Sequence, residues 1–192
     1  ACETSTGVLH PIQEIGTLLK NFPETLLLVD GITALGAVPL PMDQWGIDAL
    51  VGGSQKAFML PTGMSFVAFS KKAQAEFSNS KIQKFYFDIK KEIAANQKGE
   101  TFFSSNVTLI KALNFVLSEI ETQGLEKLFK TIQRRSNFVE QIIQLLGLSS
   151  YAKNKSASLT AVALPANIDG QKLREIMETD YNITVMGGQD QA

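Results

Sequence analysis

Three short stretches of the chain carry polar side chains where a strand should end or a turn should form. The first is ETSTG at residues 3–7, the second is Asp30 directly after the apolar run LLLV, and the third is SQK at residues 54–56 after ALVGG. In an open α/β sheet, ligands bind outside the carboxyl ends of the strands, where side chains and loop N–H groups converge. All three stretches could therefore face one crevice.

The lysine of the third stretch raises the sharpest chemical question. A lysine placed after an apolar run and two glycines loses hydration, so its amine needs a route back to water or a chemical partner. On residue types alone, each stretch also has a purely structural explanation: Lys56 as a solvated surface residue, Asp30 as a turn former, and ETSTG as a helix cap. The spacing GGSQK is not a Walker A loop, because the four-residue gap before Gly-Lys is absent.

Apolar runs and helical spacings predict the elements that would position these residues. Pro11 followed by apolar residues at helical spacing predicts a helix over about 11–22, and short apolar runs predict strands at residues 26–30, 47–53 and 65–70. A helix that leads into a strand buried on both faces is typical of a parallel α/β layer. The loop between the second and third strands is short, which permits an antiparallel neighbour, and KKAQAEF predicts a helix after it.

The second half of the chain has a different pattern. Apolar residues at helical spacing predict one helix over about 107–120 and another over 125–146. A strand at residues 158–165, a helix at 169–179 and a strand at 182–187 are then expected to form a small α+β unit. The domain boundary is expected near residues 122–124, which gives domains over residues 1–122 and 123–192.

Composition excludes several classes of protein. Of the 192 residues, 44% are apolar and 19% are charged, and the net charge is -1, so the sequence indicates neither disorder nor binding to nucleic acid or membranes. No apolar run reaches the length of a membrane span and no signal peptide pattern is present, so we expect a cytoplasmic protein. Cys2 and His10 are the only soft ligands, which predicts that there is no metal site.

Four segments resemble a known enzyme family. They are ETSTGV, the long stretch LLLVDGITALGAVPLPMDQWGIDALVGGSQKAFMLPTGMSFVAFS, KFYFDIK and TFFSS. Together they are similar to the class V aminotransferases of the fold-type I pyridoxal 5'-phosphate (PLP) enzymes, above all to the alanine- or serine-glyoxylate (serine-pyruvate) group. The resemblance implies an α/β fold: the C-terminal half of a PLP-binding large domain with a mostly parallel sheet, followed by part of a smaller α+β C-terminal domain.

The resemblance assigns catalytic roles to two residues. Lys56 matches the lysine that forms a Schiff base with PLP and later moves the proton between the substrate's alpha carbon and the cofactor. Asp30 matches the aspartate that pairs with the pyridine nitrogen and keeps it protonated. The implied reaction is transfer of an amino group from a small amino acid, such as alanine or serine, to glyoxylate or pyruvate.

Further residues match cofactor contacts of the family. Thr4 and Gln55 fall where relatives hydrogen-bond near the cofactor's phenolic oxygen, and Ser54 lies close enough to be a further candidate. Ser104 matches a threonine that reaches the phosphate in the partner subunit, with Thr101 as a companion, so the resemblance implies a homodimer. Relatives usually read Thr-Pro where this chain has Ser-Ser at residues 104 and 105, which keeps the hydroxyl but alters the stiffness of the loop.

Departures from the family pattern narrow the interpretation. Gln55 is typical of the glyoxylate-type transaminases, whereas cysteine desulfurases and kynureninases generally have another residue there, and Cys2 lies in a turn unsuited to a persulfide role. A phosphate-binding loop, a stacking aromatic residue and a carboxylate-binding arginine would lie upstream and downstream of this sequence. We therefore expect the chain to be a fragment of a longer protein. The alternatives to transamination with glyoxylate or pyruvate are aminophosphonate transamination, a lyase reaction or, for the isolated fragment, a role as an inactive dimerisation or scaffold module.

Overall fold

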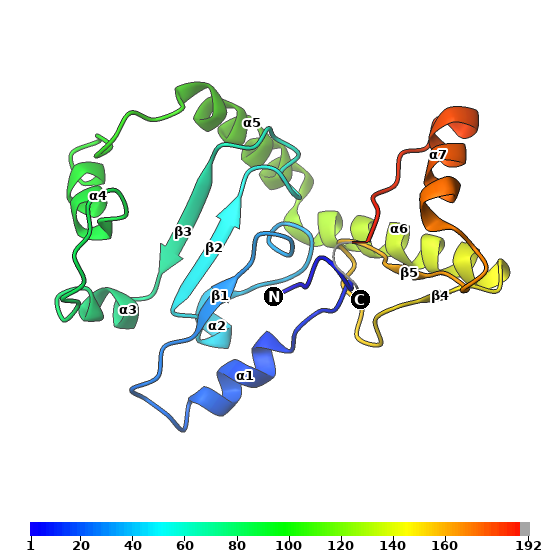
Figure 1. The fold of residues 1–192 in the computed structure, drawn as a ribbon. Helices are drawn as coiled ribbons and strands as arrows, with labels where there is room; N and C mark the ends of the chain where they lie inside the picture. The colour runs from blue at the N-terminus through cyan, green and yellow to red at the C-terminus, as the bar shows by residue number, and fades with distance from the viewer. Residues whose placement is uncertain (189–192) are drawn as a thin grey trace. The chain divides into compact units, whose positions relative to one another are not determined.

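The computed structural model describes residues 1–188, which form two compact units (Figure 1). The first, here called the sheet unit, comprises residues 12–32 and 41–122; the second, the terminal unit, comprises residues 1–11, 33–40 and the described residues from 123 onward. One division between the units falls at the expected position after Thr122, while two earlier segments belong to the terminal unit. The domain boundaries of the full-length protein stay a prediction.

The sheet unit contains three strands and five helices, in the chain order α1, β1, α2, β2, β3, α3, α4 and α5. Their bounds are α1 Ile12–Leu19, β1 Leu28–Asp30, α2 Met42–Trp45, β2 Ala49–Gly53, β3 Ser65–Phe69, α3 Lys71–Glu76, α4 Ile89–Asn96 and α5 Val107–Gln123. The three strands and the helix after β3 appear where they were predicted. Helix α4, which is capped by the Asp88 side chain, was not among the predicted elements.

The sheet has the order β1-β2-β3, with β1 parallel to β2 and β3 antiparallel to it (Figure 1). The register pairs Asp30 with Val51 and Gly53 with Ser65. The antiparallel third strand agrees with the short connection before it. Val29 points into the core, whereas Leu28 on the other face is 69% exposed, so the prediction of a strand buried on both faces is wrong for β1. Side chains alternate between the two faces of a strand, and only one face of β1 is covered by the described residues.

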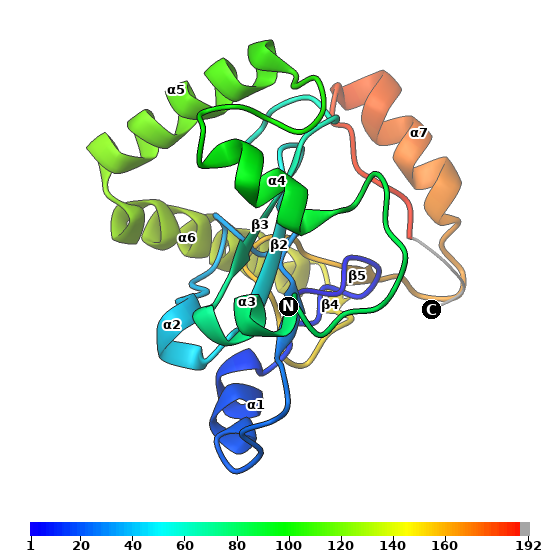
Figure 2. The same cartoon turned by 90° about the vertical axis from the view of Figure 1, so that its left-hand side faces the viewer.

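Helices α1 and α2 pack against each other, and Figure 2 shows α1 below the strands. A Cβ atom at Gly16 of α1 would lie 1.8 Å from the Trp45 carbonyl oxygen, so no larger residue fits there. Helix α2 ends at Gly46, whose φ of 66° lies in the left-handed region that glycine adopts without strain. The close helix contact therefore positions the chain that enters β2.

A buried carboxylate joins the amino ends of β1 and β2 to helix α3. Asp48 is only 6% exposed, and its side chain accepts hydrogen bonds from the Leu27 N–H (2.9 Å) and the Ser70 hydroxyl (2.7 Å). Lys72 lies 3.7 Å from the same carboxylate, and the Asp48 N–H donates to the Leu27 carbonyl oxygen at 2.8 Å. Ser70 also caps α3 by accepting from the Ala73 N–H. The register of β1 against β2 is thus fixed by side-chain as well as backbone bonds.

The terminal unit is built around a long helix. It contains α6 Leu125–Leu145, β4 Ser149–Ser150, β5 Val162–Ala163 and α7 Gly170–Tyr181, and β4 pairs with β5 in an antiparallel two-stranded sheet. Helix α6 packs against β4. Among the residues that the structure describes, every helix is too short or too polar to cross a membrane.

The strand predicted at residues 182–187 is wrong. Asn182 takes a left-handed conformation (φ 53°) and caps α7, and no strand follows it among the described residues. The Val185 carbonyl oxygen instead accepts a hydrogen bond from Arg174 Nε at 3.0 Å. The backbone groups of a strand form hydrogen bonds with a neighbouring strand, whereas here the Val185 carbonyl oxygen forms its hydrogen bond with the Arg174 side chain. The strand predicted at residues 158–165 is present but reduced to the two residues of β5.

Replacing Asp48 should destabilise the sheet unit without touching the residues proposed for chemistry. In the full-length protein, Asp48→Ala leaves the Leu27 N–H without its acceptor, and we expect a loss of about 2–3 kcal/mol, typical of hydrogen bonds to a charged group. Urea unfolding followed by circular dichroism measures it. Asp43→Ala, at an exposed aspartate of α2, is the matched control and should cost far less. Equal losses for the two variants would contradict the role given to Asp48.

Glu140 gives the terminal unit a pH-dependent contribution to stability. Lys155 Nζ lies 2.6 Å from the carboxylate and the Ser150 hydroxyl also donates to it, and both lower the pKa of Glu140 below its usual range. A carboxyl with a lowered folded-state pKa stabilises above its unfolded pKa of about 4.3, and this contribution is lost as the pH falls through the folded-state pKa.

We therefore expect the melting temperature to fall less between pH 7 and pH 3 in the full-length Glu140→Gln protein than in the wild type. Differential scanning calorimetry at both pH values is the measurement. The same drop in both proteins would show that the Glu140 pair makes no such contribution.

Candidate functional site

Two of the predicted site residues lie at the same edge of the sheet. Asp30 is the last residue of β1, and Lys56 follows the end of β2 by three residues. Because β1 and β2 are parallel neighbours, and the Gly31 N–H still donates to the Val51 carbonyl oxygen at 2.9 Å, both side chains leave the sheet at its carboxyl edge. Both are exposed. The structure thus brings an amine and a carboxylate to the edge where ligands of α/β sheets bind.

The Asp30 carboxylate is oriented by the backbone that follows it. The Ile32 N–H donates to Asp30 Oδ1 at 2.9 Å, an aspartate turn that directs the chain away from the strand. The same bond holds one carboxylate oxygen in place while the residue as a whole stays open to solvent. A carboxylate fixed in this way can face a cationic group at the sheet edge.

The residues just before Lys56 differ sharply in exposure. Ser54 is completely buried, and its hydroxyl donates to the Pro61 carbonyl oxygen at 2.7 Å. Gln55 is exposed, and its side chain folds back over Gly53, where an added Cβ would lie 2.7 Å from Gln55 Oε1. The glycine therefore leaves room for the Gln55 amide beside Lys56.

Thr4 belongs to the terminal unit. It is half-buried, and its hydroxyl lies 2.9 Å from that of Thr33. Its turn is held by the Gly7 N–H, which donates to the Glu3 carbonyl oxygen at 2.8 Å, and by the Ser156 N–H, which donates to the Gly7 carbonyl oxygen at 2.9 Å. The turn predicted to contact a ligand is therefore anchored to the segment around Ser156.

Thr101 and Ser104 lie on the exposed loop between α4 and α5. The Thr101 hydroxyl donates to the Phe103 carbonyl oxygen at 2.7 Å and accepts from the Ser105 hydroxyl at 2.9 Å. Ser104 stands exposed between these bonded residues. The loop therefore has internal hydrogen bonds that give it shape.

A cluster of aromatic side chains beside this loop was missed from the sequence. Adjacent rings in it lie 4.7–5.9 Å apart, and Lys91 Nζ lies 5.3 Å from the centre of the Phe102 ring. The members are Phe85, Tyr86, Phe87, Phe102 and Phe103. The aromatic density of KFYF and TFF was the available signal, because two such runs joined by one helix can fold together.

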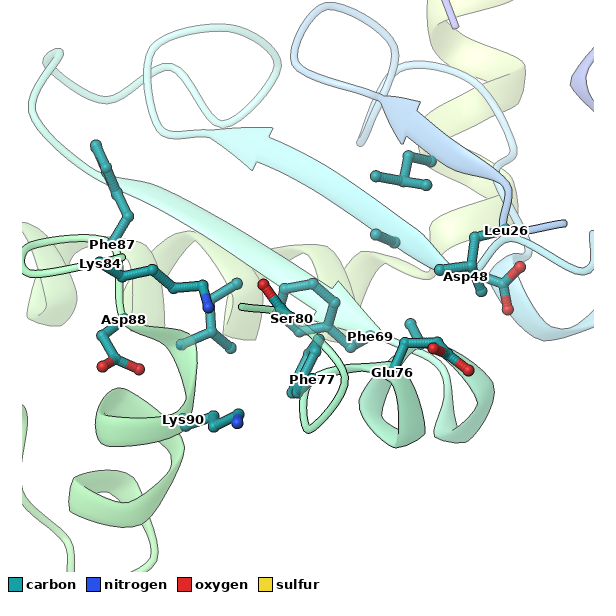
Figure 3. Close-up of a pocket in the computed structure, with 14 residues that line it drawn as sticks. Leu26, Asp48, Phe69, Glu76, Phe77, Ser80, Lys84, Phe87, Asp88 and Lys90 are labelled. Carbon is teal, nitrogen blue, oxygen red and sulfur yellow. The ribbon is translucent and has the colours of Figure 1, made fainter. Parts of the chain in front are cut away.

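An apolar pocket lies elsewhere on the sheet unit (Figure 3). It has a volume of about 240 Å³ and is lined by Leu26, Asp48, Phe69, Phe77 and Lys84, among others. Leu26 and Asp48 precede β1 and β2, so this pocket adjoins the amino ends of the parallel strands, whereas Asp30 and Lys56 lie past the carboxyl ends. The pocket and these two residues therefore lie at opposite ends of the parallel strands.

Comparison with known proteins identifies the family. The model of the class-V aminotransferases matches residues 1–192. This chain belongs to that family. At 33% identity it is similar to the alanine–glyoxylate aminotransferase of Oryctolagus cuniculus, over 97% of this chain and 50% of that protein. At 37% identity it is similar to a protein described as the small subunit of a soluble hydrogenase from Synechococcus sp., over 98% of this chain and 49% of that one.

A solved structure of this class-V family superimposes closely. The crystal structure of alanine–glyoxylate aminotransferase from Nostoc sp. gives a TM-score of 0.89 at 27% identity, over 98% of this chain and 51% of that one. This agreement assigns the chain to the fold-type I PLP-dependent transferases. The chain spans about half the length of the relatives that it matches.

Membership of the class-V family implies PLP as the cofactor, and the carboxyl edge of the sheet fits it. An aldehyde needs a primary amine, which Lys56 offers with its side chain exposed, and a pyridinium nitrogen needs a fixed anion, which Asp30 offers at the same edge. Within residues 1–188, no group of three His, Cys, Asp or Glu side chains lies close enough to hold a metal ion.

The space above Gly53 allows a direct test of Gln55. In the full-length protein, Gly53→Ala should displace the Gln55 amide, and we expect about tenfold weaker PLP binding, the size of one lost hydrogen bond. Titration of the cofactor-free protein with PLP gives the dissociation constant. If the effect acts through Gln55, Gly53→Ala should change little in a Gln55→Ala background. Additive losses in the double variant would contradict this explanation.

Proposed function

We propose that the full-length protein is a PLP-dependent aminotransferase that moves an amino group from a small amino acid, such as alanine or serine, to glyoxylate or pyruvate. The observation that carries the proposal is the exit of Asp30 and Lys56 from neighbouring parallel strands at one edge of the sheet. The glyoxylate aminotransferases named among the relatives support this choice of acceptor.

PLP supplies an electron-accepting ring that stabilises negative charge on a substrate carbon. The Lys56 amine would hold the cofactor covalently until the amino group of the substrate displaces it, and the freed amine would then move a proton from the substrate's alpha carbon to the cofactor. A single residue performs both steps because its exposed side chain can swing while its backbone stays fixed. Proton transfer by a positioned base contributes about 10²–10⁴-fold to the rate.

The Asp30 carboxylate holds a proton on the ring nitrogen. The hydrogen bond from the Ile32 N–H to Asp30 Oδ1 would hold the negative charge of the carboxylate in one position. Without a nearby anion the ring nitrogen loses its proton more readily and accepts electrons less well. Asp30 thereby acts on the rate of proton removal rather than on the fold.

Other residues are proposed to position the cofactor. Thr4 and Gln55 would donate or accept hydrogen bonds near its phenolic oxygen, and the exposed hydroxyls of Ser104 and Thr101 would reach the phosphate bound by the partner subunit. This arrangement requires a homodimer. The fuller architecture that we propose is a mostly parallel large domain that contains the sheet unit, followed by a smaller α+β domain.

Alternatives within the family differ in what they consume. A class V lyase releases product without a keto-acid acceptor, and an aminophosphonate transaminase requires a phosphonate donor. Screening of amino donors with the full-length protein, in the presence and absence of glyoxylate, separates these reactions. Product formed without any acceptor would overturn the transaminase proposal. A separate alternative, for the 192-residue chain by itself, is a catalytically inactive dimerisation or scaffold module.

Lys56→Ala should abolish turnover in the full-length protein. We also expect that borohydride treatment followed by peptide mass analysis finds PLP attached to the Lys56 peptide of the wild type and to no peptide of the variant. Lys71→Ala, at an exposed lysine of α3, is the matched control and should keep both label and activity. PLP fixed at a different lysine of the wild type would contradict the assignment.

Asp30→Ala should lower kcat at least about 100-fold while the melting temperature of the cofactor-free protein stays nearly unchanged, because an exposed carboxylate adds little stability. Asp43→Ala is the control for a second exposed aspartate and should retain activity. Steady-state kinetics with alanine and glyoxylate measure the effect. Transamination near the wild-type rate in Asp30→Ala would show that another group protonates the ring.

A further inference from the structure

The loop that carries Lys56 is closed at its base by a single buried residue. Ser54 makes three hydrogen bonds to the far side of the loop over residues 54–64. Its hydroxyl donates to the Pro61 carbonyl oxygen at 2.7 Å, its N–H donates to the Met64 carbonyl oxygen at 3.1 Å, and its own carbonyl oxygen accepts from the Leu60 N–H at 3.1 Å. Beyond these bonds the chain pairs as strands, with Gly53 opposite Ser65.

The opposite side of the lysine is anchored as well. Phe58 is only 7% exposed, and its ring packs edge to face against Phe66 of β3 with centroids 5.5 Å apart. A turn over residues 56–59 adds a further restraint. The Lys56 carbonyl oxygen accepts from the Met59 N–H at 2.9 Å, and Met59 has a positive φ of 54°. A non-glycine residue in this conformation persists only where its surroundings hold it. The backbone at Lys56 is thus fixed on both sides while its side chain stays exposed.

This geometry separates Ser54 from any ligand. The side chain has no exposed surface, and the hydroxyl proton is already donated to Pro61. We infer that Ser54 is a positioning residue, which holds the Lys56 backbone through the base of the 54–64 loop and makes no contact with the cofactor. The inference rests on the proposed role of Lys56, and it reassigns a residue expected from sequence to bind the cofactor.

Serine fits this position better than the slightly smaller alanine or the slightly larger threonine. Alanine keeps both backbone bonds but leaves the Pro61 carbonyl oxygen without the hydroxyl, so the far end of the loop is tied by two bonds instead of three. Threonine keeps the hydroxyl and adds one methyl group to a closely packed place. Because the side chain acts through the loop, its loss should loosen the amides of residues 54–64 before any cofactor is added.

The test is hydrogen–deuterium exchange of the full-length protein without cofactor. In Ser54→Ala we expect amides in the 54–64 peptide to exchange about tenfold faster, the effect of one lost hydrogen bond on local opening, while β1 peptides stay unchanged. The same variant should lower kcat about tenfold through a misplaced amine, with a smaller change in the dissociation constant for PLP. Ser54→Thr keeps the hydroxyl and should exchange more slowly than Ser54→Ala and recover part of kcat, reduced by the cost of its extra methyl group.

Ser118→Ala is the matched control. Its hydroxyl also donates to a backbone carbonyl oxygen, that of Asn114, but on the exposed face of α5. It should leave the 54–64 peptide and kcat unchanged. Weaker PLP binding in Ser54→Ala with unchanged exchange would overturn the inference in favour of a cofactor contact, and no change in either quantity would overturn it too.

A measurement on the wild type keeps the inference testable if Ser54→Ala does not fold. The closed loop should exist before the cofactor arrives, so amides in the 54–64 peptide should already be protected, and added PLP should slow them less than about tenfold. Protection that appears only with PLP would contradict the inference. Since exchange is read without cofactor, failure of this inference is distinct from failure of the proposed function, which the label on Lys56 reports.

Discussion

The arrangement of the sheet unit depends on one buried carboxylate. Asp48 holds the Leu27 N–H and the Ser70 hydroxyl at the amino ends of β1 and β2, and its backbone bonds with Leu27 begin the parallel pairing. A buried charged group is tolerated only when it is fully bonded, so this point of the sheet admits one register. A slip by one residue would exchange the two faces of β1 and move Asp30 away from the edge.

The fixed register also sets which residues lie at the carboxyl ends of the strands. Parallel neighbours end at the same edge, so Asp30 and the loop with Lys56 meet there although 25 residues separate them in sequence. Asp30 is held at the end of its strand, and Lys56 lies on a loop whose base is bonded to the adjacent strand ends, so the sheet restrains the backbone of both residues. The apolar pocket at the amino ends contains neither residue.

The 54–64 loop combines a restrained backbone with an exposed lysine side chain. Burial of Ser54 and Phe58 restrains the backbone, and exposure of Lys56 leaves its amine mobile. Local patterns predict the strands here because short apolar runs bounded by glycine are typical of buried strands. The same patterns cannot predict the Ser54 bond to Pro61, because a serine after two glycines is equally typical of an exposed turn.

The sequence by itself determined the strands of the sheet unit, the long helices and the family. The elements follow from local periodicity, and the family follows from motifs of contiguous residues. Tertiary structure alone decided three things: the loss of the strand at 182–187 to a bond with Arg174, the gathering of the aromatic cluster, and the burial of Ser54. The physical reason is common to all three. Each depends on which backbone or side-chain group a residue meets across space, and such partners have no fixed spacing along the chain.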